Sequence, residues 1–143
     1  KVLPLMGNEP FYILNSDMIW KDKGQGALNR LATEWRDDMD VLLLLVKRSE
    51  ANGHDGAGDF NMDNDGRLTF RNENTFSDYF YGGIHIIRPT CFDSIKENKF
   101  SLRKVFRQTE ATGRLFGLLH NGSWYHVGTP VSVHETEKLL KGK

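Results

Sequence analysis

The chain has 143 residues, of which 38% are hydrophobic and 27% are charged, so it can form one well-cored domain and is not a disordered chain. Basic and acidic residues number 19 each, which gives no overall attraction to nucleic acid or to an anionic membrane. The single cysteine, Cys91, excludes an internal disulfide and a thiolate-rich metal site, and no apolar run is long enough to span a bilayer. We expect one compact cytoplasmic domain that binds a small ligand.

The first predicted elements are a strand, a helix and a second strand. An apolar strand over Pro10–Leu14 is followed by Asn15 and Asp17, so polar groups stand where the strand ends, the usual place for a site in an open α/β sheet. Apolar residues at helical spacing predict an amphipathic helix over residues 25–37, with Trp35 on its core face. The unbroken apolar run Val41–Val46 is typical of a strand buried on both faces. Together these segments predict a βαβ unit.

The middle of the chain alternates glycines with aspartates. Between Gly53 and Gly66 this composition predicts loops and tight turns around the short segment Asp59–Met62, as in a small antiparallel excursion. A calcium loop is excluded, because the window that starts at Asp59 has Asn64 at its sixth position and no glutamate at its twelfth. Strand-like composition then resumes over residues 79–87 and ends at Arg88-Pro89.

The last third predicts a helix, two strands and a second helix. Ser101 can cap a helix that ends near Gly113, and residues 115–119 form the next strand. The expected buried face of that helix consists of Leu102, Val105, Phe106 and Thr109. The segment Trp124–Pro130 ends another strand, turns at a glycine and opens a helix that runs toward residue 140. The basic residues at its end suit the helix dipole, namely Lys138, Lys141 and Lys143.

Six segments, in this order, carry a resemblance to a known family. They are Leu3-Pro4-Leu5, Phe11–Asp17, the buried strand Val41–Val46, Gly56–Phe60, Tyr81–Ile84 and Trp124–Pro130. The chain resembles bacterial sugar-1-phosphate nucleotidyltransferases, and within them the N-acetylmuramate 1-phosphate uridylyltransferase and mannose-1-phosphate guanylyltransferase-like group. The resemblance implies an α/β fold: a Rossmann-like mixed sheet flanked by helices, of the GT-A type shared with many glycosyltransferases.

The same resemblance implies that residues 1–143 form the C-terminal portion of a single nucleotidyltransferase domain. The glycine-rich nucleotide-binding loop that such enzymes carry after their first strand has no counterpart in this sequence. Loss of the first strand and helix would expose one flank of the sheet. We therefore expect the isolated segment to be unstable or to associate.

The implied reaction joins a nucleoside triphosphate, UTP or GTP, to a sugar 1-phosphate and releases pyrophosphate. The favoured product is UDP-N-acetylmuramic acid, made in peptidoglycan recycling, and mannose-1-phosphate guanylyltransferase is the alternative enzyme. A noncatalytic regulatory subunit that binds a sugar nucleotide is a further alternative. A glycosyltransferase of similar fold is another, because Asn15-Ser16-Asp17 loosely resembles an acidic metal motif. The oligomeric state is left open.

Two residues match metal-site positions of the family. Asp17 matches its metal-binding aspartate, and a carboxylate oxygen is a ligand that Mg²⁺ prefers. His126 stands where the family has a second metal-binding aspartate, although a neutral imidazole is a poor Mg²⁺ ligand. His126 could bond a phosphate, hold a water on the metal or accept Mn²⁺ instead. The alternatives are that Asp17 caps a loop and that His126 is an ordinary turn histidine.

The resemblance also assigns residues to the sugar and its phosphate. Arg71 is a candidate catalytic residue, because a guanidinium suits phosphate, with Glu73 nearby to contact sugar hydroxyls. The other candidate substrate-binding residues are Asn15, Gly58, Asp59, Tyr81, Gly82 and Gly83. The alternatives are loop glycines, solvated turn residues and a solvated charge pair on a strand. The remaining histidines show no metal-ligand spacing and are left unassigned: His54, His85, His120 and His134.

Overall fold

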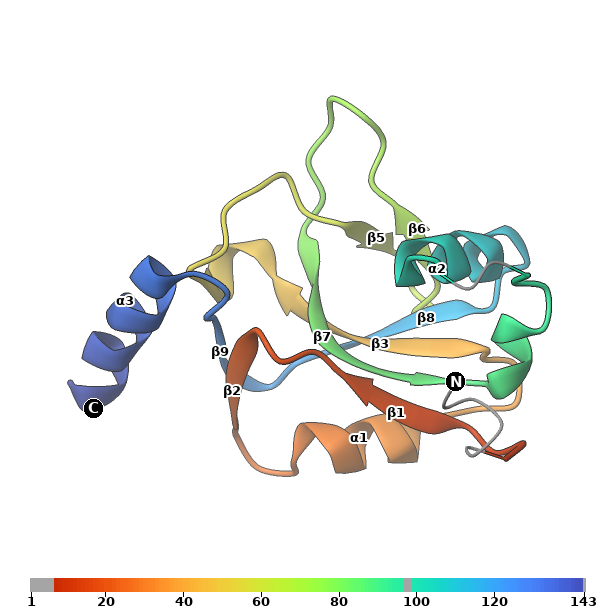
Figure 1. The fold of residues 1–143 in the computed structure, drawn as a ribbon, viewed down its shortest axis with the longest axis horizontal. Coiled ribbons are helices and arrows are strands. Elements are labelled where there is room, and N and C mark those ends of the chain that lie inside the picture. The colour runs from red at the N-terminus through yellow and green to blue at the C-terminus, as the bar shows by residue number, and fades with distance from the viewer. Residues whose placement is uncertain (1–6, 97–98, 143) are drawn as a thin grey trace.

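The computed structural model describes residues 7–96 and 99–142, so the Leu3-Pro4-Leu5 segment and Lys143 lie outside the described residues. Its core is a six-stranded sheet in the order β6-β5-β7-β3-β8, with β1 also paired to β7 (Figure 1). These strands are β1 (Phe11–Leu14), β3 (Val41–Lys47), β5 (Phe60–Met62), β6 (Leu68–Phe70), β7 (Tyr79–Ile87) and β8 (Leu115–Leu119). A three-stranded sheet beside it has the order β2-β9-β4, with β2 (Met18–Asp22), β9 (Gly122–His126) and β4 (Ala51–Asn52).

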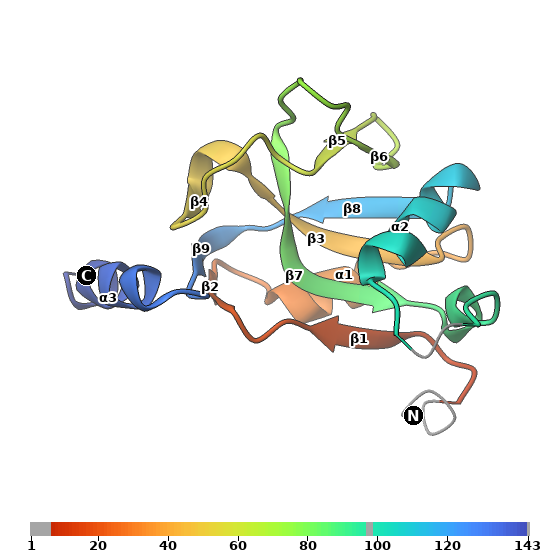
Figure 2. The same ribbon diagram turned by 45° about the horizontal axis from the view of Figure 1, so that its top comes forward.

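Strand β3 is buried on both faces, as its apolar run predicts. Successive side chains point to opposite faces of the sheet, and each face is covered by one helix (Figures 1 and 2). Leu42, Leu44 and Val46 pack in one cluster with α1 (Ala27–Glu34). The alternate residues of β3 pack in the other cluster with Val105 and Phe106 of α2 (Leu102–Ala111). The sheet is therefore the middle layer of a three-layer α/β fold.

The predicted strand–helix–strand unit is present but more elaborate than its sequence pattern indicates. Strands β1 and β3 both pair antiparallel with β7, so they run parallel to each other with β7 between them. Strand β2, which the pattern does not reveal, lies between β1 and the helix and pairs with β9 of the smaller sheet. Helix α1 begins and ends inside the predicted range 25–37, with Trp35 packed against the core as expected.

The other elements agree closely with the sequence patterns. Strands β5 and β6 form the antiparallel excursion, in which the Asp63 carboxylate accepts the backbone N–H groups of Asp65 and Arg67 at 2.9 Å each. Short 3₁₀ turns follow β3 and β7, at Arg48–Glu50 and Pro89–Phe92. Ser101 caps α2, whose buried residues are Val105, Phe106 and Thr109.

Helix α3 (Pro130–Lys141) extends away from both sheets (Figure 1). Thr129 caps it through a hydrogen bond from the Ser132 N–H, and Ser132 caps in return, so the predicted capping residue is confirmed. Lys138 and Lys141 stand in its last turn, where cations suit the dipole. Within residues 7–96 and 99–142, no helix has the length and apolar character needed to cross a membrane.

Candidate functional site

Asp17 and His126 are brought together by the smaller sheet. Asp17 lies in the turn between β1 and β2, and the pairing of Met18 with His126 places the histidine beside it. The Val127 N–H donates to the Asp17 carbonyl at 2.8 Å, and His126 Nε2 lies 3.6 Å from Asp17 Oδ2. A Cβ on Gly128 would lie 2.7 Å from His126 Nε2, so a side chain there would displace the imidazole from its present position. The two predicted metal-site residues are thus neighbours, although 109 positions separate them in sequence (126 − 17).

His54 joins this pair, which sequence spacing does not reveal. Strand β4 runs parallel to β9, and the loop after it places the His54 ring 5.3 Å from the His126 ring and 4.2 Å from the Phe80 ring, between centroids. Among the described residues, no group of three or more His, Cys, Asp or Glu side chains is arranged to hold a metal ion. The possible metal ligands that lie near one another here are the Asp17 carboxylate and the imidazoles of His54 and His126. A hard divalent ion bound here would therefore be held by Asp17 and by oxygen atoms of other bound molecules.

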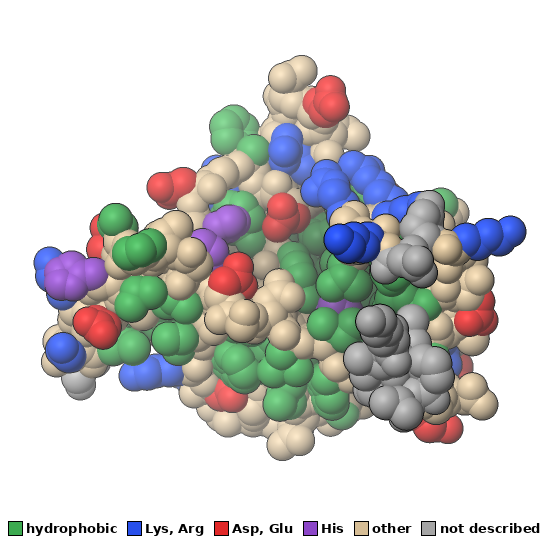
Figure 3. Space-filling view, in the orientation of Figure 1, with side chains coloured by type: hydrophobic (Ala, Val, Ile, Leu, Met, Phe, Trp, Pro, Cys, Tyr) green, Lys and Arg blue, Asp and Glu red, His purple; other side chains and the backbone are tan. Residues whose placement is uncertain are grey.

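A pocket of about 210 Å³ opens on the same face of the molecule. Figure 3 shows this face hollowed at its centre, with hydrophobic side chains in the hollow and Lys and Arg side chains along its upper right rim. Eight residues line the pocket: Asn15, Asp59, Phe60, Phe70, Tyr81, Leu102, Arg103 and Phe106. Three of the predicted substrate-binding residues are therefore assembled in one cavity, namely Asn15, Asp59 and Tyr81.

The polar side of the pocket is fixed by hydrogen bonds of its own backbone. Asp59 Oδ2 accepts the Tyr81 N–H at 2.9 Å, and the Asn15 N–H donates to the Gly83 carbonyl at 2.8 Å. These bonds join the end of β1, the start of β5 and the middle of β7. Asp59 is thus a structural partner of β7 as well as a pocket-lining carboxylate.

Tyr81 is held from behind by a fully buried histidine. The Tyr81 hydroxyl lies 2.5 Å from His85 Nδ1, and the Phe106 ring meets both rings edge-on. Burial, followed by the negative charge of Asp17, raises the pKa of Tyr81 above its ordinary value. Burial lowers the pKa of His85 to about 3, so the imidazole is neutral at physiological pH. His85 Nε2 has no hydrogen-bond partner in the described part of the chain.

At each of the three predicted sugar-side glycines, a Cβ would lie close to other atoms of the protein. A Cβ on Gly58 would lie 2.2 Å from Ser77 Oγ, and Gly58 has a left-handed backbone with φ of +92°. A Cβ on Gly82 would lie 3.0 Å from the Leu44 carbonyl oxygen, and one on Gly83 2.9 Å from Met18 Cγ. The protein itself thus fills the space that a side chain would take. Contact between these backbones and a sugar stays a prediction.

Arg71 and Glu73 follow β6, and no ion pair joins them among the described residues, so the alternative of a charge pair on a strand is wrong. Arg71 Nε donates to the Gly58 carbonyl at 2.9 Å, and its Nη1 donates to the carbonyls of Asn72 and Thr75 at 3.1 Å each. Both residues lie on the connection after β6 rather than on a strand, and neither lines the pocket. Arg71 therefore fastens this connection to the Gly58 loop, and its contact with phosphate stays a prediction.

Comparisons with known proteins agree with this architecture. No family model matches the chain. It is 32% identical over 96% of its length to an N-acetylmuramate alpha-1-phosphate uridylyltransferase from Caulobacter vibrioides, of which it covers 57%. It is 30% identical over 97% of its length to the protein of the same description from Neisseria meningitidis serogroup B, of which it covers 58%. The chain thus spans little more than half the length of these curated relatives.

A solved structure shows the same fold. The crystal structure of an apo UDP-glucose pyrophosphorylase superposes with a TM-score of 0.74 and 16% identity, over 99% of this chain and 57% of that one. This likeness extends over both sheets and their helices, which confirms the expected Rossmann-like α/β class. Over almost its whole length the chain is therefore similar in sequence to N-acetylmuramate alpha-1-phosphate uridylyltransferases, and it shares the fold of a UDP-glucose pyrophosphorylase.

Proposed function

We propose that this chain forms the sugar-1-phosphate side of a cytoplasmic enzyme that makes UDP-N-acetylmuramic acid from UTP and N-acetylmuramate 1-phosphate. A phosphate oxygen of the sugar 1-phosphate forms a bond to the α-phosphorus of UTP. The bond from that phosphorus to the bridging oxygen breaks, and pyrophosphate leaves with the electron pair. The observation that carries the proposal is the placement of Asp17 and His126 beside a pocket lined by Asn15, Asp59 and Tyr81.

The pocket residues and the Asp17–His126 pair would have different roles in the reaction. Asp59 and Tyr81 would bond sugar hydroxyls, and the apolar wall of the pocket would exclude water from the bound sugar. Asp17 would hold a Mg²⁺ or Mn²⁺ ion, and His126 would bond a phosphate oxygen or a water beside it. When bound, the ion supplies positive charge that offsets the negative charge of the two phosphate groups. Correct placement of the two substrates is the main task of the protein.

The nucleotide-binding part of the enzyme would lie outside this chain. The curated relatives are longer, and the glycine-rich loop expected for the triphosphate has no counterpart in this sequence. We propose that the chain is the C-terminal portion of the domain. The relatives' names favour uridine over guanosine, and mannose-1-phosphate guanylyltransferase stays the alternative.

The experiment is an assay of pyrophosphate release by the full-length protein that carries this chain. UTP and GTP are each paired with N-acetylmuramate 1-phosphate or mannose 1-phosphate, in Mg²⁺ and then in Mn²⁺. We expect release from UTP with N-acetylmuramate 1-phosphate. Asp17→Asn should lower kcat by about a hundredfold or more, because it removes the carboxylate that holds the ion.

The matched control is Asp65→Asn, which removes the same charge from an exposed turn of the β5–β6 hairpin and should leave release unchanged. If only the pairing of GTP with mannose 1-phosphate released pyrophosphate, the protein would instead be a mannose-1-phosphate guanylyltransferase. If no pairing releases pyrophosphate although a sugar nucleotide binds, the noncatalytic regulatory subunit is correct.

A further inference from the structure

Arg103 contributes a cation to the wall of the pocket. It lies on the exposed side of α2, and its guanidinium carbon lies 4.8 Å from the centroid of the Phe70 ring. It forms no ion pair with an acidic side chain within residues 7–96 and 99–142. The ring face limits the orientations of the guanidinium and leaves its N–H groups available to a ligand.

Two other arginines near Arg103 do not line the pocket, and their guanidinium groups are bound to other protein groups. Arg107, one turn later on α2, lies 3.8 Å over the same Phe70 ring, but it pairs with Glu110 at 3.6 Å and does not line the pocket. Arg71 uses its guanidinium on three backbone carbonyls. Among these three arginines, Arg103 is therefore the one that lines the pocket and has no acidic partner in the described part of the chain.

The surroundings of Arg103 are apolar. Phe70 of β6 and Leu102 and Phe106 of α2 line the pocket beside Arg103, and Phe60 of β5 adds a fourth apolar side chain. Asp59, just before β5, and Tyr81 of β7 supply polar groups to the same pocket. A ligand group that suits this side combines a small apolar part with an anion. Because Asp59 repels an anion, such a group would turn toward α2.

N-acetylmuramate carries a group of this kind. It differs from N-acetylglucosamine by one lactyl ether, which consists of a methyl-bearing carbon and a carboxylate. We propose that the α2 side of the pocket is a subsite for this carboxylate-bearing substituent, with Arg103 as the residue that selects it. The proposal rests on the proposed function, since it assigns a sugar to the same site. Arg103 binds the carboxylate through two parallel N–H bonds, and the apolar walls contact the methyl group.

The test measures binding rather than turnover, in the full-length protein. UDP-N-acetylmuramic acid and UDP-N-acetylglucosamine are each titrated by calorimetry into the unmodified protein and into Arg103→Gln. We expect the unmodified protein to prefer the muramic compound. Arg103→Gln should reduce this preference about tenfold, which corresponds to the loss of one charged hydrogen-bonded contact. Arg103→Lys keeps the charge without the paired N–H groups and should lose part of the preference.

Arg107→Gln is the matched control, because it removes the same charge one turn away on the same ring and should leave the preference unchanged. If Arg103→Gln weakened the binding of both compounds equally, the proposal would be overturned, and Arg103 would instead contact the diphosphate that the two compounds share. The proposal would also be overturned if the unmodified protein bound both compounds equally, or if Arg103→Gln kept the full preference for the muramic compound. Absence of pyrophosphate release with intact selective binding would instead reject the proposed function alone.

Discussion

The buried His85 side chain makes the stability of the protein depend on pH. Its folded-state pKa of about 3 lies below the ordinary 6.5, so the unfolded chain binds a proton more readily than the folded chain. The stabilisation is therefore present above pH 6.5 and is lost as pH falls toward 3. We expect the free energy of unfolding to fall by about 2 kcal/mol between pH 7 and pH 5 through this group.

Urea denaturation at the two pH values measures the effect. His85→Leu removes the titrating group, so its free energy of unfolding should change less with pH, although its value at pH 7 is lower because Tyr81 loses a hydrogen bond. His134→Gln removes an exposed histidine from α3 and should leave the pH dependence unaltered. An unchanged slope in His85→Leu would show that His85 binds its proton equally well in the folded and the unfolded chain.

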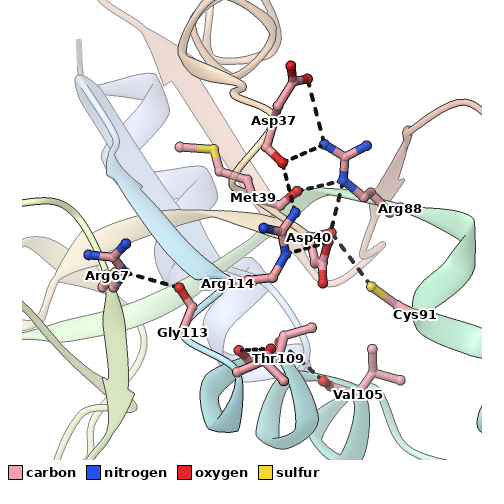
Figure 4. A network of polar contacts seen from close by, with 11 residues as sticks. Asp37, Met39, Asp40, Arg67, Arg88, Cys91, Val105, Thr109, Gly113 and Arg114 are labelled. Atoms are coloured by element: carbon pink, nitrogen blue, oxygen red, sulfur yellow. Dashed lines mark hydrogen bonds and ion pairs between the residues drawn. The ribbon is translucent and has the colours of Figure 1, made fainter.

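At the scale of elements, one carboxylate ties three strands together at the end of the sheet opposite Asp17. Asp40 Oδ1 lies 3.0 Å from Arg114 Nε and 3.4 Å from Arg88 Nε, at the starts of β3 and β8 and the end of β7 (Figure 4). Arg88 also donates to the backbone carbonyls of Met39 and Asp37, and Arg114 donates to the carbonyl of Asp37. Asp40→Ala would leave the partly buried Arg114 without its carboxylate partner and Arg88 with only the exposed Asp37 carboxylate, at 4.0 Å.

We expect Asp40→Ala to lower the free energy of unfolding by about 2 kcal/mol, without a change in pyrophosphate release. Denaturation midpoints and the release assay measure the two quantities. Asp38→Ala removes an exposed carboxylate that pairs only with Arg36 in this region, and no measurable change is expected. If the two variants behave alike, the strand ends are held by the backbone hydrogen bonds alone.

Sequence patterns predict the elements of this protein better than their pairing. The residues of β3, β7, β8 and α2 are evident, because burial on two faces or on one helical stripe leaves a clear periodicity. Strands β2 and β4 are short and largely exposed, so no such periodicity marks them. The Asp17–His126 contact is anticipated by motif, whereas His54 reaches His126 through the pairing of β4 with β9, which local sequence does not encode.

At the scale of the whole molecule, the open edge of β1 governs the behaviour of the chain on its own. Among the described residues β1 pairs only with β7, and its Tyr12 and Leu14 side chains are 37% and 47% exposed. An unpaired strand edge with exposed apolar side chains is a template for another strand. If the chain has the proposed C-terminal position in a longer domain, a strand from outside it is expected to cover this edge.

The isolated chain of 143 residues should therefore associate, whereas the full-length protein should not do so through this edge. Light scattering at several concentrations measures the association, and circular dichroism shows whether the chain is folded. Leu14→Lys places a charge on the exposed side of β1 and should reduce association of the isolated chain. Val131→Lys makes the same change on α3, away from the edge, and should leave association through β1 intact. A folded, concentration-independent monomer of the unmodified chain would mean that the edge needs no partner strand.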